Sequence, residues 1–306
     1  MRRPAVSLPF AARVALIVSL AAALAGGSSA AAAAQAASGV TPFDYVASAT
    51  TCKRPADAAR GGPTLMVGAP GAAPLPAYVL TPSGHLSHAP AILWVHWLGK
   101  VDTTNHTEFE SDALALTEHG VVSMLVDMPW SAPHWFDTRT TAGDYAATVA
   151  QVVALRRALD CLTTMQGVDR TRIAYVGHDF GAMDGALLLG VDDRPAYAVL
   201  MAPTLSFWEW YLLGKQPADP AAYVAQMSAF DLPGWLARGK QKATLLQVGQ
   251  DDEYVSQATG IAILNAIPDR NRTIKAYKLD HALDDEAVHE DRSAWLLEHL
   301  TDASHP

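Results

Sequence analysis

Apolar runs and amphipathic stretches alternate along most of the chain. The apolar runs are short and apolar at successive positions, which predicts strands buried on both faces. The amphipathic stretches carry apolar residues at helical spacing, which predicts helices between the strands. The predicted strands span residues 77–80, 91–97, 121–128, 172–177, 196–203, 243–249 and 273–279, and the predicted helices span residues 106–119, 142–165, 180–190 and 286–300.

This alternation predicts an α/β fold, a mostly parallel central sheet with helices on both faces. The chain has 306 residues and half of them are apolar, which is enough for one sizeable domain. We expect a single domain over residues 37–306. Residues 203–242 form a short insert between two predicted strands, in place of a full cap domain.

The first 36 residues differ in composition from the rest of the chain. Three arginines are their only charged residues, and an apolar stretch runs from Val14 to Ala25. This layout is typical of a secretory signal peptide, with Ala34 and Ala36 offering a cleavage point, and the apolar stretch is short for a membrane span. We therefore expect cleavage of residues 1–36 and a secreted protein, extracellular or periplasmic, with no stable membrane association.

The charge balance limits the kinds of partner. The net charge is −9 and the pI is about 5.6, which argues against nucleic acid or an anionic membrane surface as partner. A small-molecule substrate is the better expectation. The sequence contains no phosphate-binding loop, dinucleotide fingerprint or metal-ligand spacing, so we expect no cofactor and no metal. It does not indicate the oligomeric state.

Cys52 and Cys161 are the two cysteines of the chain. An oxidising compartment would allow them to form one disulfide between the N-terminal segment and a predicted helix. Two separate, buried thiols fit the sequence equally well. Neither cysteine has the neighbours of a metal site or of a redox pair, so we expect no cysteine chemistry.

Candidate chemistry gathers just after the predicted strands, where ligands bind in a parallel α/β sheet. The motif "GHDFG" at residues 177–181 stands where a strand meets a helix. Its glycines allow a sharp turn, and the positive end of the helix dipole would keep the carboxylate of Asp179 ionised and nucleophilic. From this motif alone, an ordinary helix N-cap explains Asp179 equally well.

Two later residues favour the catalytic interpretation. Asp252, with Asp251 as the alternative, follows one predicted strand, and His281 follows the next. An imidazole held by a carboxylate can take a proton from water, because the carboxylate stabilises the imidazolium that forms. The order nucleophile, acid, histidine is the chain order of the α/β-hydrolases.

Over nearly all of residues 63–303 the chain resembles α/β-hydrolases of the dienelactone-hydrolase-like kind. Its "GHDFG" elbow is similar to the "GHDWG" elbow of epoxide hydrolases and haloalkane dehalogenases, where aspartate is the nucleophile. The resemblance implies Asp179 as nucleophile, His281 as base and Asp252 as the acid that orients it. "HWLG" at residues 96–99 stands in the place of the "HGxP" motif of those enzymes. The resemblance therefore implies an oxyanion hole formed by the backbone N–H groups of Trp97 and Phe180.

Substrate contacts are expected from aromatic and polar residues in the loops around this elbow. In epoxide hydrolases a tyrosine hydroxyl protonates the leaving oxygen, and Tyr211 and Tyr223 are the tyrosines of the insert. Aromatic residues in an insert more often pack against the domain than contact substrate. The candidate substrate-binding residues are His96, Trp130, Trp135, Trp208 and Tyr211.

The nucleophile type restricts the reaction. A carboxylate that attacks a saturated carbon forms an ordinary ester, whereas attack on an ester carbonyl forms an anhydride. We therefore expect a hydrolase that forms an alkyl-enzyme ester, most naturally with an epoxide substrate. The alternative is a dienelactone-hydrolase-like carboxylester or lactone hydrolase. A haloalkane or haloacid dehalogenase fits less well, since Phe180 stands where those enzymes place a halide-binding Trp, and a non-catalytic binding protein would not need Asp252 and His281.

Overall fold

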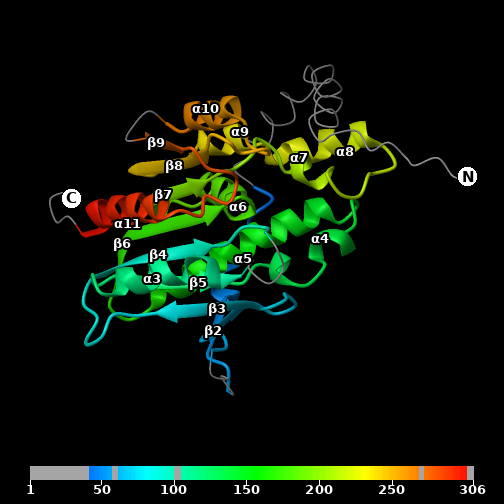
Figure 1. The fold of residues 1–306 in the computed structure, drawn as a ribbon. Coiled ribbons are helices and arrows are strands. Elements are labelled where there is room, and N and C mark those ends of the chain that lie inside the picture. Colours follow the sequence, from blue (N-terminus) through cyan, green and yellow to red (C-terminus); the bar gives the residue numbers. More distant parts are fainter. Residues whose placement is uncertain (1–40, 57–60, 100–104, 269–271, 302–306) are drawn as a thin grey trace, which may run out of the picture.

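The computed structural model describes residues 41–56, 61–99, 105–268 and 272–301. The expected signal segment, residues 1–36, lies outside this range. The strands form one sheet with the order β1-β2-β3-β5-β4-β6-β7-β8-β9 (Figure 1). Their bounds are β1 Thr51–Lys53, β2 Leu65–Gly68, β3 Leu75–Leu80, β4 Ala89–Val95, β5 Val122–Val126, β6 Val168–His178, β7 Pro195–Met201, β8 Ala243–Gly249 and β9 Arg272–Tyr277.

Strand direction divides the sheet into two parts. From β5 to β9 neighbouring strands run parallel, because a helical crossover joins each strand to the next. β1, β2 and β3 pair antiparallel, and β3 joins them to β5. The parallel part confirms the predicted α/β fold. β1 and β2 are not among the strands that the sequence predicts.

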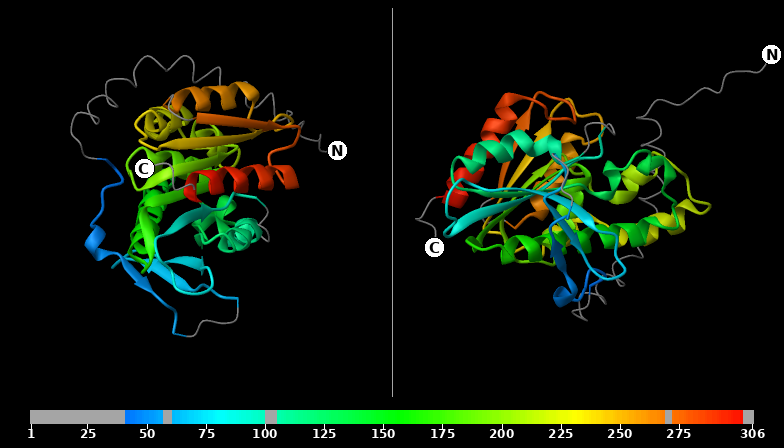
Figure 2. Two further views of the ribbon diagram at one scale, coloured as in Figure 1. Left: turned by 90° about the vertical axis from the view of Figure 1, so that its left-hand side faces the viewer. Right: turned by 90° about the horizontal axis from the view of Figure 1, so that it is seen from below.

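Helices cover both faces of the sheet (Figure 2). α3 and α11 pack on one face, and α5, α6, α9 and α10 pack on the other. The α-helices are α3 Glu110–Thr117, α4 Trp135–Thr138, α5 Asp144–Thr164, α6 Phe180–Leu189, α7 Phe207–Tyr211, α8 Pro220–Met227, α9 Leu232–Leu236, α10 Gln257–Ala266 and α11 Glu286–Thr301, and the 3-10 turns are η1 Ala47–Ala49, η2 His106–Phe109, η3 Pro129–Ser131 and η4 Ser228–Phe230. Among these helices none is both long and apolar enough to span a membrane.

β4 shows why the apolar runs are continuous. Side chains alternate between the two faces of a strand. Leu93 and Val95 belong to the core under α5 and α6, whereas Ile92 and Trp94 belong to the core under α3 and α11. All seven residues of β4 are buried. A strand covered on both faces must be apolar at successive positions, as the sequence pattern indicates.

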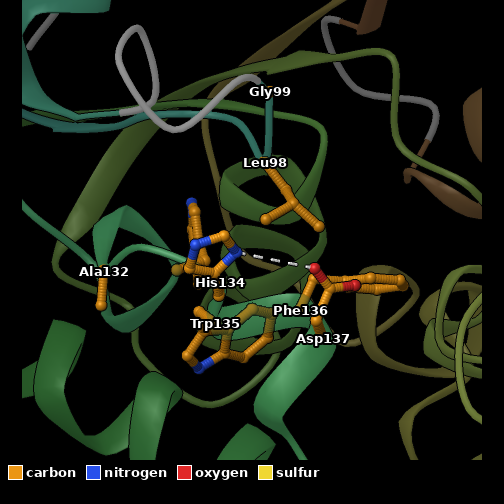
Figure 3. A pocket seen from close by; sticks show the side chains of 8 residues that line it. Leu98, Gly99, Ala132, His134, Trp135, Phe136 and Asp137 are labelled. Carbon is orange, nitrogen blue, oxygen red and sulfur yellow. Dashed lines mark ion pairs between the residues drawn. The ribbon is translucent and has the colours of Figure 1, made fainter.

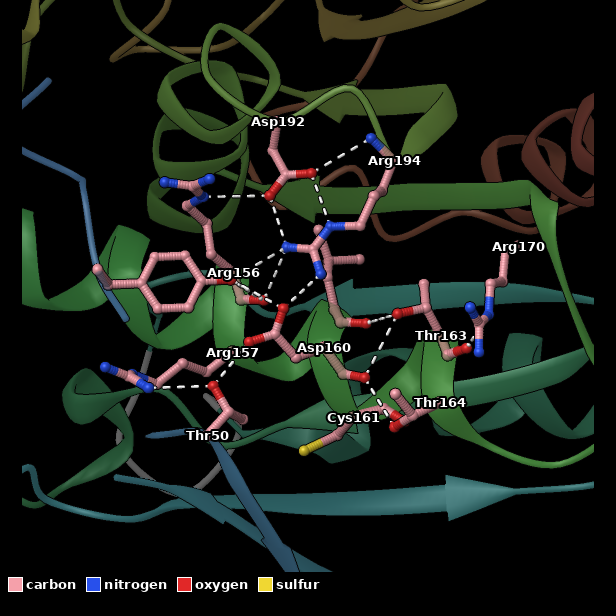
Figure 4. Close-up of polar contacts among 12 residues, drawn as sticks. Thr50, Arg156, Arg157, Asp160, Cys161, Thr163, Thr164, Arg170, Asp192 and Arg194 are labelled. Atoms are coloured by element: carbon pink, nitrogen blue, oxygen red, sulfur yellow. Dashed lines mark hydrogen bonds and ion pairs between the residues drawn. The ribbon is translucent and has the colours of Figure 1, made fainter. Parts of the chain in front are cut away.

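The N-terminal segment is fixed to α5 by a disulfide and by a polar cluster, and Figure 4 shows the polar cluster around Asp160. Cys52 and Cys161 are joined, with their Cα atoms 5.7 Å apart. The carboxylate of the adjacent Asp160 accepts hydrogen bonds from Tyr45 Oη at 2.8 Å and Thr50 Oγ1 at 2.6 Å. Of the two interpretations that the sequence left open, the disulfide is the one present.

The insert at residues 203–242 contains α7, α8, η4 and α9. α7 and α8 lie near α4 at one end of the sheet (Figure 1). Arg139, next to α4, connects the two parts: its guanidinium donates to the carbonyl oxygen of Tyr211, and its own carbonyl accepts from Lys215 Nζ at 3.0 Å. These two hydrogen bonds hold the insert against the loop that follows β5.

Candidate active site

β6, Asp179 and α6 form a strand-turn-helix elbow. Asp179 has φ 51° and ψ −113°, a conformation that costs a non-glycine residue about 1–3 kcal/mol. Glycine is required on both sides, since a Cβ at Gly177 would overlap the carbonyl of Gly181, and a Cβ at Gly181 would overlap the carbonyl of Val95. The elbow is held by a hydrogen bond from Asp179 N to Met201 O at 2.8 Å.

The two carboxylate oxygens of Asp179 have different environments. Oδ2 accepts a hydrogen bond from the backbone N–H of Leu98 at 3.1 Å. Oδ1 lies 3.7 Å from Nε2 of His281, which is too long for a hydrogen bond. Both Oδ1 and Nε2 are buried and have no hydrogen-bond partner among the described residues. One oxygen is thus held in place and the other is free to react.

His281 lies in the loop after β9 and is oriented by Asp252. Its Nδ1 is 2.8 Å from Asp252 Oδ2. The other oxygen of Asp252 accepts from the backbone N–H groups of Tyr254 at 2.8 Å and Val255 at 2.9 Å. Asp251, the alternative acid, is exposed, and its backbone N–H donates to Leu279 O at 3.0 Å. The structure therefore brings Asp179, His281 and Asp252 together in the order that the sequence predicts.

The two carboxylates control the proton of His281. Burial acts to lower the pKa of His281, but the negative charge of Asp179, the hydrogen bond to Asp252 and the negative charge of Asp252 outweigh it and raise the pKa to about 9. Burial likewise acts to raise the pKa of Asp252, and its contacts with His281 outweigh burial and lower the pKa. His281, which lies between Asp179 and Asp252, therefore keeps its proton at neutral pH.

The predicted oxyanion hole differs by one residue. The N–H of Trp97 points away from Asp179 and donates to Oε2 of Glu108 at 2.8 Å. Leu98 supplies the donor in its place. The N–H of Phe180 is the first amide of α6, so the helix provides no acceptor for it, and it adjoins Asp179 in the chain. The donors available to an oxyanion are thus those of Leu98 and Phe180.

A pocket of about 240 Å³ opens beside Leu98. Its lining combines the end of residues 96–99, here called the oxyanion loop, with the segment around α4 (Figure 3). Trp130 and Trp135, two of the predicted substrate-binding residues, line it. Both rings pack on Phe180, with ring centroids 5.6 and 6.0 Å from that of Phe180. The complete lining is Leu98, Gly99, Trp130, Ala132, His134, Trp135, Phe136 and Asp137.

Three predicted substrate-binding residues do not line this pocket. His96 is buried, burial lowers its pKa, and its Nε2 accepts from Met128 N at 3.0 Å, so it supports the oxyanion loop from behind. Trp208 is buried and belongs to the hydrophobic core on the α5 and α6 side of the sheet. Tyr211 is fully buried, and its hydroxyl lies 3.3 Å from Thr148 Oγ1.

Tyr223, the other expected proton donor, is also engaged elsewhere. Its hydroxyl donates to Asp144 Oδ2 at 2.6 Å, and Asp144 pairs with Arg139 at 2.5 Å. The sequence suggested these two tyrosines as proton donors, but the local sequence around a tyrosine does not indicate which way its hydroxyl points. Both hydroxyls belong to a buried polar cluster between α5 and the insert.

Other residues complete the site without having been predicted for it. The rings of Trp210 and Tyr254 lie 5.4 and 5.2 Å from that of His281. Oε1 of Glu108 lies 2.7 Å from Nδ1 of His178, behind the oxyanion loop. His178 is part of the "GHDFG" motif, so the sequence could have indicated that it belongs to the site. The sequence around Glu108 contains no such indication, because nothing in it links Glu108 to residues 96–99.

Metal-ligating side chains do not cluster in the described ranges: no group of three or more His, Cys, Asp or Glu there is arranged to hold an ion. The site combines a carboxylate oxygen without a partner among the described residues, an imidazole held by a second carboxylate, and two backbone N–H groups beside Asp179. These are the parts needed to form and hydrolyse a covalent ester.

Comparisons with known proteins identify the fold. No protein-family profile and no curated sequence matches the chain. Among solved structures, it is similar to an acetyl xylan esterase from Paenibacillus sp. R4, with 18% identity and a TM-score of 0.62 over 81% of this chain and 88% of that one. Est1E from Butyrivibrio proteoclasticus gives 18% identity and a TM-score of 0.60 over 77% and 98% of the two chains.

A Klebsiella pneumoniae subsp. pneumoniae MGH 78578 protein assigned as a dienelactone hydrolase gives 15% identity and a TM-score of 0.56, over 75% of this chain and 94% of that one. Identities this low establish the architecture and leave the reaction to be argued from the site. The order and direction of the strands, the elbow after β6 and these structural matches agree: the chain has the α/β-hydrolase fold.

Proposed function

We propose that the protein hydrolyses small carboxylic esters or lactones through a covalent ester on Asp179, with His281 and Asp252 releasing the product. The observation that carries this proposal is the placement of the Asp179 carboxylate. Oδ2 is held by Leu98 N–H, while Oδ1 is free and faces His281. A side chain that only capped α6 would bond the first amides of the helix, and Asp179 makes no such bond.

In the first step Oδ1 of Asp179 attacks the substrate. Attack at the saturated carbon of a strained lactone or activated ester forms the Asp179 Oδ1–C bond and breaks the bond from that carbon to the ester oxygen. The group that leaves is a carboxylate, which needs no proton. This route yields an ordinary alkyl ester on Asp179 and avoids the anhydride that attack on the carbonyl would give.

The second step uses a change in charge at the base. Esterification neutralises Asp179 and so removes one of the two carboxylates that raise the pKa of His281. The ring then gives up its proton more readily and can take one from water. That water attacks the carbonyl carbon of the Asp179 ester, and the negative charge develops on Oδ2, beside the N–H groups of Leu98 and Phe180. The intermediate then collapses: the Cγ–Oδ1 bond breaks, Oδ1 leaves as the alcohol oxygen of the product, and His281 gives that oxygen the proton taken from water.

Two observations support esters and lactones as the substrate class. The similar structures include an acetyl xylan esterase and a protein assigned as a dienelactone hydrolase. The hydroxyls of Tyr211 and Tyr223 are engaged in the buried cluster with Thr148 and Asp144, so the donors expected for an epoxide oxygen do not face the site. A carboxylate leaving group requires no such donor.

An epoxide is the second candidate substrate, and one observation favours it. His281 is protonated at neutral pH in the resting site, since its pKa is raised to about 9. It lies on the free side of Asp179 and could pass its proton to the oxygen of an opening epoxide ring. The neutral ring would then serve as base in the second step.

The test is to trap the covalent ester. The His281→Gln protein is incubated with a panel of lactones, esters and epoxides and examined by intact-protein and peptide mass spectrometry, with His281→Gln/Asp179→Asn as the control. We expect an adduct on the Asp179 peptide from a lactone or ester. Adducts from epoxides alone would establish the second candidate. No adduct from compounds that the wild-type protein cleaves would overturn Asp179 as nucleophile.

Export remains part of this proposal. The composition of residues 1–36 favours a secretory signal, and the Cys52–Cys161 disulfide is typical of proteins that fold in an oxidising compartment. Export can be tested by sequencing the N-terminus of the protein collected outside the cells that produce it. A mature protein that begins near residue 37 supports export, and a protein retained inside the cell with residues 1–36 intact contradicts it.

A further inference from the structure

Glu108 and His178 connect three parts of the candidate site. One oxygen of Glu108 accepts from the N–H of Trp97 at 2.8 Å, on the oxyanion loop. The other lies 2.7 Å from Nδ1 of His178, in the elbow next to Asp179. Nε2 of His178 lies 2.9 Å from the backbone carbonyl oxygen of His281. A single chain of hydrogen bonds thus joins the oxyanion loop, the elbow and the base.

The partners of His178 determine its protonation state. A backbone carbonyl can only accept, so Nε2 must carry a proton. The proton between Oε1 of Glu108 and Nδ1 lies on Nδ1 when the glutamate is ionised, and the ring is then doubly protonated. The ring is fully buried. Its charge is matched by Glu108 and by the indole of Trp97, which stacks on it with a centroid distance of 5.1 Å and an angle of 3° between the planes.

Glu108 is itself fixed. It lies on η2, where the side chain of Asn105 accepts from Thr107 N at 2.9 Å. His106 N donates to Asp127 Oδ1 at 2.8 Å, which ties η2 to the loop after β5. Phe109, the next residue, is buried. A carboxylate on so constrained a turn can set the position of the groups that it contacts.

We propose that Glu108 and doubly protonated His178 form a bridge that positions the oxyanion loop and His281 relative to Asp179. The proposal rests on the proposed function of the site. If the N–H of Trp97 lost Glu108, residues 97 and 98 would be free to rotate and Leu98 N–H could leave Asp179. If His178 lost its Nε2 proton or its place, the carbonyl of His281 would lose its donor. Neither Glu108 nor His178 lines the pocket beside Leu98, so we assign both as positioning residues.

Two substitutions of Glu108 separate geometry from charge. In Glu108→Gln the amide oxygen can accept from Trp97 N–H while the amide nitrogen donates to Nδ1 of His178, which then keeps only its Nε2 proton. All the contacts survive with a neutral ring. In Glu108→Ala the Trp97 N–H and Nδ1 of His178 both lose their partner. Glu110→Ala, two residues further on and exposed, is the matched control.

The first measurement does not depend on activity. Nitrogen NMR of labelled histidine should show a doubly protonated ring in the wild-type protein at neutral pH, assigned to His178 by its disappearance in His178→Asn. The ring should be singly protonated in Glu108→Gln. A singly protonated His178 in the wild-type protein would overturn the proposal. Failure of the proposed function leaves this signal unchanged, so the two failures are distinguishable.

The second measurement is turnover. Displacing catalytic groups by about 1 Å can cost about 100-fold in rate. Glu108→Ala should therefore lower kcat by about 100-fold with little change in KM, while Glu108→Gln should stay within a few fold of the wild-type protein and of Glu110→Ala. Thermal melts of all the variants exclude unfolding as the cause. Wild-type kcat in folded Glu108→Ala, or an equal loss in Glu108→Gln, would contradict positioning by the bridge.

Discussion

Oδ1 of Asp179 and Nε2 of His281 face each other across 3.7 Å, and neither atom has a hydrogen-bond partner in the described part of the chain. Unpaired buried polar atoms are costly, so a pair of them kept face to face is a strong indication of chemistry. The same two residues are coupled electrostatically, since Asp179 raises the pKa of His281. The predictions below follow from this coupling and from the packing around it.

Removing the charge of Asp179 should lower the pKa of His281. In Asp179→Asn one of the two carboxylates that hold the proton is gone, and burial then weighs more heavily against the charged ring. An NMR titration of the ring should place the pKa clearly below the value of about 9. Asp251→Asn, on an exposed neighbour of Asp252, should leave it unchanged. If the pKa of His281 were the same in Asp179→Asn as in the wild-type protein, Asp179 would not act on His281.

The same pKa predicts how stability depends on pH. Folded His281 binds its proton more tightly than the unfolded ring, whose pKa is 6.5. The resulting stabilisation is complete below about pH 6.5 and is lost as the pH rises toward about 9. Urea unfolding between pH 6 and 10 should show this decline in the wild-type protein and a smaller one in Asp179→Asn. Parallel curves for the two proteins would contradict the linkage.

The elbow should not tolerate a methyl group at Gly181. Its Cβ would overlap the carbonyl oxygen of Val95, which is backbone and cannot move aside. We expect Gly181→Ala to lower the free energy of unfolding by about 1–3 kcal/mol and to abolish turnover. Gly234→Ala is the control, because nothing lies near its Cβ and it is inside α9, where alanine should stabilise by about 0.5–1 kcal/mol. A stable, active Gly181→Ala protein would contradict the assigned elbow geometry.

The sequence predicts the parallel core well because burial on both faces leaves a clear pattern. β8 was predicted with the bounds that the structure has, and the elbow, Asp252 and His281 each follow a predicted strand. β1 and β2 were missed because both are short and lie at the antiparallel edge, where their side chains are mostly half-buried or exposed. α10 was missed although Ser256 caps it.

The details of the site depend on contacts between distant segments. Leu98 N–H, and not Trp97 N–H, donates to Asp179, because Glu108 on η2 accepts from the Trp97 N–H. The direction of Tyr211 is set by Thr148 and by the cation of Arg139, 4.5 Å from its ring. Motifs fix which residues follow the strands. They do not fix which way loop amides and insert side chains point.

Asp184 should make the protein less stable as the pH rises. It lies one turn after the elbow, is fully buried, and neither carboxyl oxygen has a partner among the described residues, so burial raises its pKa well above 3.8. The folded state therefore favours the protonated form, and stability is lost as the pH rises above about 4. Asp184→Asn keeps the shape without the charge.

The difference in unfolding free energy between Asp184→Asn and the wild-type protein should grow above pH 4, by up to about 1.4 kcal/mol for each pH unit until the folded carboxyl ionises. Chemical unfolding at pH 4, 5, 6 and 7 measures it. A constant difference across that range would show that Asp184 is ionised in the folded protein.

Removing the disulfide should destabilise the protein. Cys52 and Cys161 are separated by 109 positions, and a cross-link over a loop of that length strongly restricts the unfolded chain. The double variant Cys52→Ser/Cys161→Ser should lose about 2–5 kcal/mol of unfolding free energy. Reduction of the wild-type protein should have the same effect. A serine variant as stable as the oxidised wild-type protein would show that the contacts of Asp160 alone hold the N-terminal segment.

The most direct test of the central claim is a single turnover in heavy-oxygen water, with the enzyme in excess over the substrate that forms the adduct. If water attacks an ester on Asp179, the heavy oxygen enters the Asp179 carboxylate first, and the first product molecule carries an oxygen from the enzyme. We predict a labelled Asp179 peptide and an unlabelled product. A labelled product with an unlabelled Asp179 would mean that water attacks the substrate directly, and that Asp179 is not the nucleophile.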